Sequence, residues 1–265
     1  MICETGNSLI CEKEIKPHCF DIASAGYVNL DRSHAGGGDS KECVKSRSAF
    51  LSLGHYKPIS DKINELIGIF SPSPSIILDA GCGEGYYTVA SSKEFLLSNF
   101  IGIDISKSAV EHAAKTAKRE KINNLSFAVS SIFDIPMENS SIDCITSIFA
   151  PCPEDEFARV LKENGVLVIA AAGENHLLGL KKALYENVYL NEARADLPDT
   201  SMFRLCEKSK ISYRIHLKDQ AEISSLFAMT PYFYRTSISD KEKLSSLNCL
   251  DTEVDIEFSV YKRNG

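Results

Sequence analysis

Residues 78–85 read LDAGCGEG and follow directly on the apolar pair Ile76-Ile77. The glycines at positions 81, 83 and 85 let the backbone turn tightly and approach a ligand where a Cβ atom would clash. A strand that runs into such a loop is typical of nucleotide-binding α/β domains. A nicotinamide-dinucleotide fingerprint would require one more glycine at position 86, which is Tyr86 in this chain. The stretch therefore favours another nucleoside cofactor.

Asp104 closes the next apolar run, Ile101-Gly102-Ile103. An acidic side chain at the end of the second strand can accept hydrogen bonds from both hydroxyls of a ribose. With this carboxylate, the sequence predicts an adenosine-binding site, and the loop contributes Asp79, Gly81, Gly83 and Gly85. The alternative interpretation is an ordinary glycine turn followed by a surface aspartate.

The surrounding sequence alternates apolar runs with helix-like segments such as 109–118. Continuous apolar runs predict strands that are buried on both faces, so we expect a doubly wound α/β fold with a mostly parallel sheet. Ser40 can cap a helix that runs to about residue 53, and a second helix is indicated over 59–70. The strands are predicted at 76–78, 99–103, 125–129, 142–149, 166–172 and, by alternation, 252–261.

Composition narrows the class of protein. With 265 residues, 44% of them hydrophobic, the chain suits one α/β domain with a small appendage. No apolar run is long enough for a membrane span and no signal-peptide pattern is present, so we expect a cytoplasmic protein. Nine cysteines, an odd number in a mid-sized chain, predict reduced thiols. A net charge of −7 confines any nucleic-acid contact to a local basic patch.

The substrate side is expected near the end of the 142–149 run. Ligands of open α/β sheets bind at the carboxyl ends of the strands, so Ala150, Pro151 and Cys152 are candidates for contact with the substrate. Pro151 is equally well explained as a residue that ends the strand. Asp134 follows the third strand, and it is a candidate for general acid–base catalysis.

The pattern D-x-G-x-G-x-G at 79–85, followed by G-x-D at 102–104, resembles motifs I and II of class I S-adenosylmethionine-dependent methyltransferases. Segments outside the cofactor fold resemble one family in particular, the 23S rRNA (guanine-N1)-methyltransferases. These segments are Phe20-Asp21, 25–30, Gly38-Asp39-Ser40, Arg47, 49–51, Gly54-His55-Tyr56, Phe149-Ala150-Pro151-Cys152, Asn175-His176-Leu177 and Met229-Thr230-Pro231.

This resemblance implies methyl transfer to N1 of a guanine in a 23S rRNA hairpin, with S-adenosylmethionine held by Tyr56, Gly83, Glu84 and His176. Guanine N1 keeps its proton at neutral pH, so a general base should help. The candidates are Asp134, Glu84 and His55, of which Glu84 is better explained as a contact of the cofactor. Taken alone, His55 and His176 are better explained as structural histidines.

The resemblance also implies a zinc-finger-like RNA-recognition module in residues 1–35, before a methyltransferase domain in 36–265. The ligand candidates are Cys3, Cys11, His18 and Cys19, which offer the sulfur and nitrogen atoms of a tetrahedral Zn²⁺ site. The family pattern, C-x2-C followed by C-x3-H, is incomplete here. A metal-free remnant that docks RNA or the catalytic domain is the alternative.

Two other functions remain open at this level. The first is a small-molecule methyltransferase, since a shared fold does not determine the substrate. The second is a non-catalytic RNA-binding protein that keeps the cofactor pocket. The sequence also leaves open whether the chain forms a homodimer.

Overall fold

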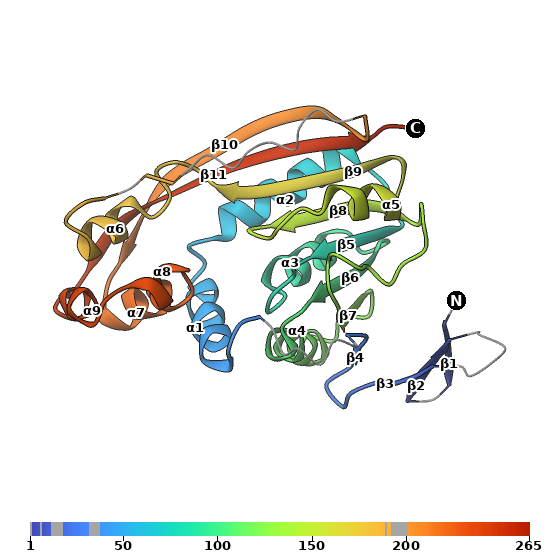
Figure 1. Cartoon of the computed structure of the whole chain (residues 1–265), viewed down its shortest axis with the longest axis horizontal. Helices are drawn as coiled ribbons and strands as arrows, with labels where there is room; N and C mark the ends of the chain where they lie inside the picture. Colours follow the sequence, from blue (N-terminus) through green and yellow to red (C-terminus); the bar gives the residue numbers. More distant parts are fainter. Residues whose placement is uncertain (1, 6, 12–17, 32–37, 189, 192–200) are drawn as a thin grey trace.

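The computed structural model describes residues 2–5, 7–11, 18–31, 38–188, 190–191 and 201–265, the first range by its backbone alone (Figure 1). Within these residues one large sheet has eight strands in the order β10-β11-β9-β8-β5-β6-β7-β4. The strands are β4 (Tyr27–Asn29), β5 (Ile76–Ala80), β6 (Asn99–Asp104), β7 (Leu125–Val129), β8 (Ile142–Ile148), β9 (Leu161–Ala172), β10 (Phe203–Leu217) and β11 (Leu250–Arg263).

The sheet is mostly parallel, as the sequence predicts. Each neighbouring pair from β9 to β4 is parallel, whereas β11 runs antiparallel to β9 and to β10. This is the Rossmann-like arrangement expected from the alternating apolar runs. Its consequence for function is that β5, β6, β7, β8 and β9 all end at the same edge.

Helices cover both faces of the sheet. The face that carries Ile77 and Phe100 packs against α2 (Lys57–Phe70), α3 (Tyr86–Glu94) and α4 (Lys107–Arg119). The face that carries Leu78 packs against α5 (Glu154–Val160). The remaining described helices are α1 (Lys41–Ser52), α6 (Leu178–Leu184), α7 (Gln220–Ala228), α8 (Tyr232–Arg235) and α9 (Ile238–Ser245).

The two predicted helices before β5 are confirmed. The Ser40 side chain accepts a hydrogen bond of 3.2 Å from the Cys43 N–H, which caps α1 as expected for an N-cap serine. Along α2, Ile59, Ile63, Leu66 and Ile67 are buried. Each side chain of this kind stabilises the fold by about 1.5–3 kcal/mol when fully buried.

The described part of the N-terminal segment contains four short strands. The strands β1 (Ile2–Thr5), β2 (Ser8–Cys11) and β3 (Cys19–Asp21) form a separate three-stranded sheet, and β4 joins the large sheet beside β7. The sequence does not reveal these strands, because strands of three or four residues are too short to show a periodic pattern. The predicted boundary between residues 35 and 36 lies outside the described residues.

None of the helices in the described ranges is both long and apolar enough to cross a bilayer.

Candidate active site

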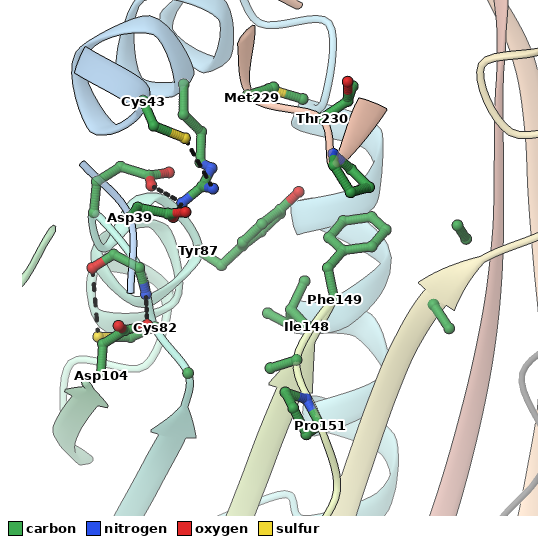
Figure 2. Close-up of a pocket in the computed structure, with 18 of the residues that line it drawn as sticks. Asp39, Cys43, Cys82, Tyr87, Asp104, Ile148, Phe149, Pro151, Met229 and Thr230 are labelled. Atoms are coloured by element: carbon green, nitrogen blue, oxygen red, sulfur yellow. Dashed lines mark hydrogen bonds and ion pairs between the residues drawn. The ribbon is translucent and has the colours of Figure 1, made fainter. Parts of the chain in front are cut away.

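A cavity of about 1160 Å³ opens at the carboxyl ends of the parallel strands. Its walls come from the loops that follow β5, β6, β7, β8 and β9, from α1, and from residues 229–234. Figure 2 shows part of this cavity, with Asp39 and Cys43 on one side and Phe149 and Pro151 on the other. Its volume lies somewhat above the usual range for small-molecule sites, about 300–1000 Å³.

The glycine loop after β5 is tightly enclosed. Gly81 has a φ of +81°, and a Cβ atom there would lie only 2.6 Å from Cβ of Ala150. At Gly85, also at +81°, a Cβ atom would lie 2.8 Å from Cβ of Ala113. Only glycine avoids both the unfavourable φ and the clash. The loop therefore lies directly against the loop after β8, where the sequence predicts the substrate side.

Asp79, at the start of this loop, is held by two hydrogen bonds. Its two carboxylate oxygens accept hydrogen bonds from the hydroxyls of Thr88, at 2.5 Å, and Thr146, at 2.9 Å. Burial raises the pKa of Asp79 to about 6, although both threonine hydroxyls oppose the shift. Asp79 also lines the cavity, so it supports the loop and its predicted contact with the cofactor stays a prediction.

Asp104 is fixed at the end of β6. One carboxylate oxygen accepts from the Gly83 N–H at 3.0 Å, and the other accepts from the Ser106 N–H at 2.7 Å. Burial raises the pKa of this carboxyl, and the two backbone hydrogen bonds oppose that shift. Each oxygen keeps a second lone pair, which can accept from a ligand hydroxyl. The predicted sugar-binding carboxylate is thus held rigidly at the cavity wall.

A charged group of three residues lies beside the loop. Nη1 of Arg47 is 2.5 Å from an Asp39 oxygen and 3.2 Å from a Glu84 oxygen. Glu84 is only 7% exposed, and its burial raises its pKa while Arg47 opposes the rise. Burial works against the charge of Arg47, but Glu84 and Asp39 outweigh it and raise the pKa of Arg47. All three residues line the cavity.

Three aromatic side chains meet at the far wall. The Tyr56 hydroxyl lies 3.2 Å from Nε2 of His176, and the Phe149 ring is stacked on the His176 ring with centroids 6.0 Å apart. Burial lowers the pKa of His176 to about 4 and raises that of Tyr56. Both groups are therefore uncharged near neutral pH. The structure brings together two residues that lie far apart in sequence and were predicted to hold the cofactor.

Three other predicted residues do not line the cavity. His55 packs against Phe50, with Nε2 3.7 Å from a carboxylate oxygen of Glu222. Asp134 is exposed outside the lining, and the Cys152 thiol is 3.3 Å from the Ser147 hydroxyl. By contrast, Ala150 and Pro151 do line it. Among the three candidate bases, only Glu84 reaches the cavity.

The predicted zinc ligands are only partly brought together. Sγ of Cys11 lies 3.5 Å from Nδ1 of His18. Cys19 pairs with Ile10, the neighbour of Cys11, so the pleat directs Cys19 to the opposite face of the small sheet. Among the residues whose side chains are described, no group of three His, Cys, Asp or Glu is placed to bind a metal ion. The side chain of Cys3 lies outside that set, so the four-ligand site stays a prediction.

Comparison with known proteins agrees with this geometry. A family model described as a methyltransferase domain matches residues 73–228. A Bacillus subtilis (strain 168) protein, YxjB, named as a candidate 23S rRNA (guanine-N(1)-)-methyltransferase, is 28% identical over 97% of this chain and 91% of its own. The 23S rRNA (guanine(748)-N(1))-methyltransferase of Streptomyces fradiae is 30% identical over 63% of this chain and 59% of its own.

Solved structures match the fold at low sequence identity. The MccD protein superposes with a TM-score of 0.52 and 19% identity, covering 78% of this chain and 98% of its own. The YcgJ protein of Bacillus subtilis gives a TM-score of 0.50 and 15% identity, covering 73% and 93%. The family match spans more than half of the chain and includes the glycine loop and Asp104. The chain therefore belongs to the methyltransferase-domain family and is a class I S-adenosylmethionine-dependent methyltransferase.

Proposed function

We propose that this enzyme transfers a methyl group from S-adenosylmethionine to N1 of a guanine in a 23S rRNA hairpin. The observation that carries the proposal is the large cavity in which the Gly81–Gly85 loop, Asp104 and the Tyr56–His176 pair converge. The substrate assignment is supported by a relative with a 23S rRNA name that is similar over 97% of this chain, well beyond the cofactor domain.

Each side of the cavity has a distinct part in this proposal. Asp104 accepts hydrogen bonds from the ribose hydroxyls, and the glycine loop lies close to the rest of the cofactor. The Tyr56 hydroxyl and the ion-paired Glu84 contact its amino-acid end. When bound, S-adenosylmethionine supplies the electrophilic methyl group. The loop after β8, with Ala150 and Pro151, faces the position where the guanine must enter.

Alignment is the main task of the protein in this reaction. Guanine N1 must give up its proton to a base or to water and approach the methyl group in line, and S-adenosylhomocysteine is released. Holding two reactants in that geometry removes much of the entropic part of the barrier. The volume of about 1160 Å³ leaves room for a base beside the cofactor. A base can enter such a recessed site only after leaving its stack, which favours a loop nucleotide over paired RNA.

The test is a methyl-transfer assay with the full chain. Purified protein is incubated with labelled S-adenosylmethionine and unmodified 23S rRNA or its hairpin fragments, and the modified base is mapped by nuclease digestion and mass spectrometry. We expect N1-methylguanine at one position. Label found only on small metabolites would overturn the RNA assignment, and RNA binding without transfer would identify a non-catalytic protein.

The proposal also includes a zinc site in the N-terminal segment, which would serve in the recognition of the RNA. Zn²⁺ would be held by Cys11 and His18, which already lie together, and Cys19 would have to turn from the opposite face of the small sheet to join Cys3 as a further ligand. Metal analysis of the purified full chain checks this directly, and we expect one zinc ion per chain. The zinc proposal fails if far less than one zinc ion per chain is found, and if this content stays the same after zinc has been added and the excess removed. The N-terminal segment would then be a metal-free docking module.

A further inference from the structure

Exposed aromatic side chains are concentrated at the cavity. Among the described residues, three Phe or Tyr side chains are exposed: Phe133 and Tyr234 at 66% and Phe149 at 43%. All three line the cavity, although they come from three separate segments. In proteins that bind single-stranded RNA, unstacked bases commonly stack on exposed aromatic side chains.

Phe149 is distinguished from the other two by its backbone. Its φ is +54°, a conformation that is a clear outlier for a bulky side chain. The surrounding structure holds it there, since its N–H donates to the Ala170 carbonyl at 2.9 Å and extends the pairing of β8 with β9. Strain of this kind is concentrated at functional sites, where it fixes a side chain in a required direction.

One face of the Phe149 ring already has a partner. It is stacked on His176 with an angle of 22° between the rings, and the Tyr56 ring lies 6.5 Å away. These contacts fix the orientation of the ring, and the exposed part of the side chain remains open to the cavity. Figure 2 shows the ring extending from the end of β8, across the cavity from Asp39 and Cys43.

The strands that they follow place Phe133 and Phe149 on different sides of the cavity. Phe133 follows β7, the neighbour of β6 that ends in Asp104, so it lies on the adenosine side. Phe149 follows β8 and directly precedes Ala150 and Pro151 on the other side of β5. Phe149 therefore directly adjoins the loop that faces the incoming guanine.

We propose that Phe149 is a positioning residue on which the extruded guanine stacks for methyl transfer. This inference rests on the proposed function. Stacking of a base on an aromatic side chain is worth about 1–3 kcal/mol. Most RNA affinity comes from phosphate contacts elsewhere, so losing the ring should affect the placement of the base far more than the binding of the RNA.

The central variant is Phe149→Leu, which keeps an apolar side chain but removes the aromatic face. We expect kcat to fall by about 5- to 150-fold, the equivalent of about 1–3 kcal/mol, while KM for RNA and Kd for S-adenosylmethionine stay within about twofold. Phe149→Tyr should restore most of the activity. Leu97→Ala, which changes a fully exposed residue outside the cavity, is the matched surface control.

Phe149→Gly separates stacking from folding. Glycine adopts the left-handed conformation without a steric penalty, so this variant should fold and still lose activity as Phe149→Leu does. A direct readout is the fluorescence of a guanine analogue placed at the mapped target position. We expect quenching on binding to the wild-type protein and to Phe149→Tyr, and little quenching with Phe149→Leu.

The outcomes distinguish this inference from the proposed function. If the wild-type protein methylates no rRNA guanine, the proposed function itself fails. If it does so but Phe149→Leu retains wild-type kcat and quenching, the stacking role is overturned while the function stands. A Kd for S-adenosylmethionine that weakens as much as kcat falls would assign the ring to the cofactor and would also overturn it.

Discussion

The backbone N–H of Asp255 in β11 donates a hydrogen bond to Nδ1 of His176 across 3.3 Å. Nδ1 is therefore an acceptor, and the single proton of the neutral imidazole is on Nε2. Nε2 then donates to the Tyr56 hydroxyl, which lies 3.2 Å away. The hydroxyl proton of Tyr56 is left free to be donated to a ligand in the cavity. His176 thus acts as an orienting group for Tyr56 and has no free lone pair for a guanine proton.

The buried, neutral state of His176 predicts a specific dependence of stability on pH. Its pKa in the folded protein is about 4, below the ordinary 6.5 of the unfolded chain. The stabilisation linked to this residue is complete above pH 6.5 and is lost as the pH falls towards 4, by about 3 kcal/mol in total. We expect the difference in unfolding free energy between wild type and His176→Gln to shrink from pH 7 to pH 4.5. Urea titrations measure it, and a constant difference would contradict the assignment.

Asp104→Asn should weaken cofactor binding. The amide replaces one acceptor oxygen, so either Gly83 or Ser106 loses its acceptor, and the ribose loses a charged partner. A charge-assisted hydrogen bond is worth about 1.5–3 kcal/mol, so Kd for S-adenosylmethionine should rise by about 10-fold or more. Calorimetry measures the change. The control is Asp61→Asn, in which an exposed carboxylate of α2 loses only its pairing with Lys57. If the Asp104 variant binds S-adenosylmethionine as tightly as the wild type does, the placement of the adenosine beside Asp104 is refuted.

Thr146→Val should destabilise the protein in a pH-dependent way. Because burial raises the pKa of Asp79 to about 6, its carboxyl is ionised at pH 8 and mainly protonated at pH 5. Losing the 2.9 Å hydrogen bond should cost about 1.5–3 kcal/mol at pH 8, when the acceptor is charged, and about 0.5–1.5 kcal/mol at pH 5. Denaturant unfolding at both pH values is the measurement. A larger loss at pH 5 would show that Asp79 is not the partner that matters.

Arg47→Met should be more harmful than the double variant that also carries Glu84→Gln. Removing the guanidinium leaves the buried Glu84 carboxylate without its ion-pair partner, which typically costs about 3–5 kcal/mol. Glu84→Gln removes the uncompensated charge, so part of the loss should be recovered. Unfolding free energies of the wild type, both single variants and the double variant measure the coupling. Strictly additive effects would mean that the ion pair does not stabilise the loop.

The strands of the parallel sheet were predictable because burial on both faces leaves a continuous apolar run, as at residues 125–129, which match β7. β10 was missed. Its second half does alternate, with Ile211, Tyr213, Ile215 and Leu217, but charged and small polar residues dominate its first half. As the edge strand of the described sheet, it exposes one face to water, so no continuous apolar run forms.

The site was predictable where chemistry and local sequence coincide, as in the glycine loop and Asp104. The Arg47–Asp39–Glu84 group was not, because three residues from separate segments meet only after folding and no local spacing signals it. Sequence adjacency was also misleading at the end of β8. Pro151 lines the cavity, but the next side chain, Cys152, lies against Ser147 outside the lining.

The strand order has a consequence for how the chain matures during translation. β10 pairs only with β11 in the described sheet, and β11 is inserted between β10 and β9 although it comes later in the sequence. A nascent chain that has emerged only as far as residue 217 thus carries fifteen residues of β10 with no neighbouring strand. Asp255, which sets the His176 tautomer, emerges later still. A ribosome that stalls within this region would therefore hold a domain whose glycine loop is complete but whose Tyr56–His176 pair is not yet set.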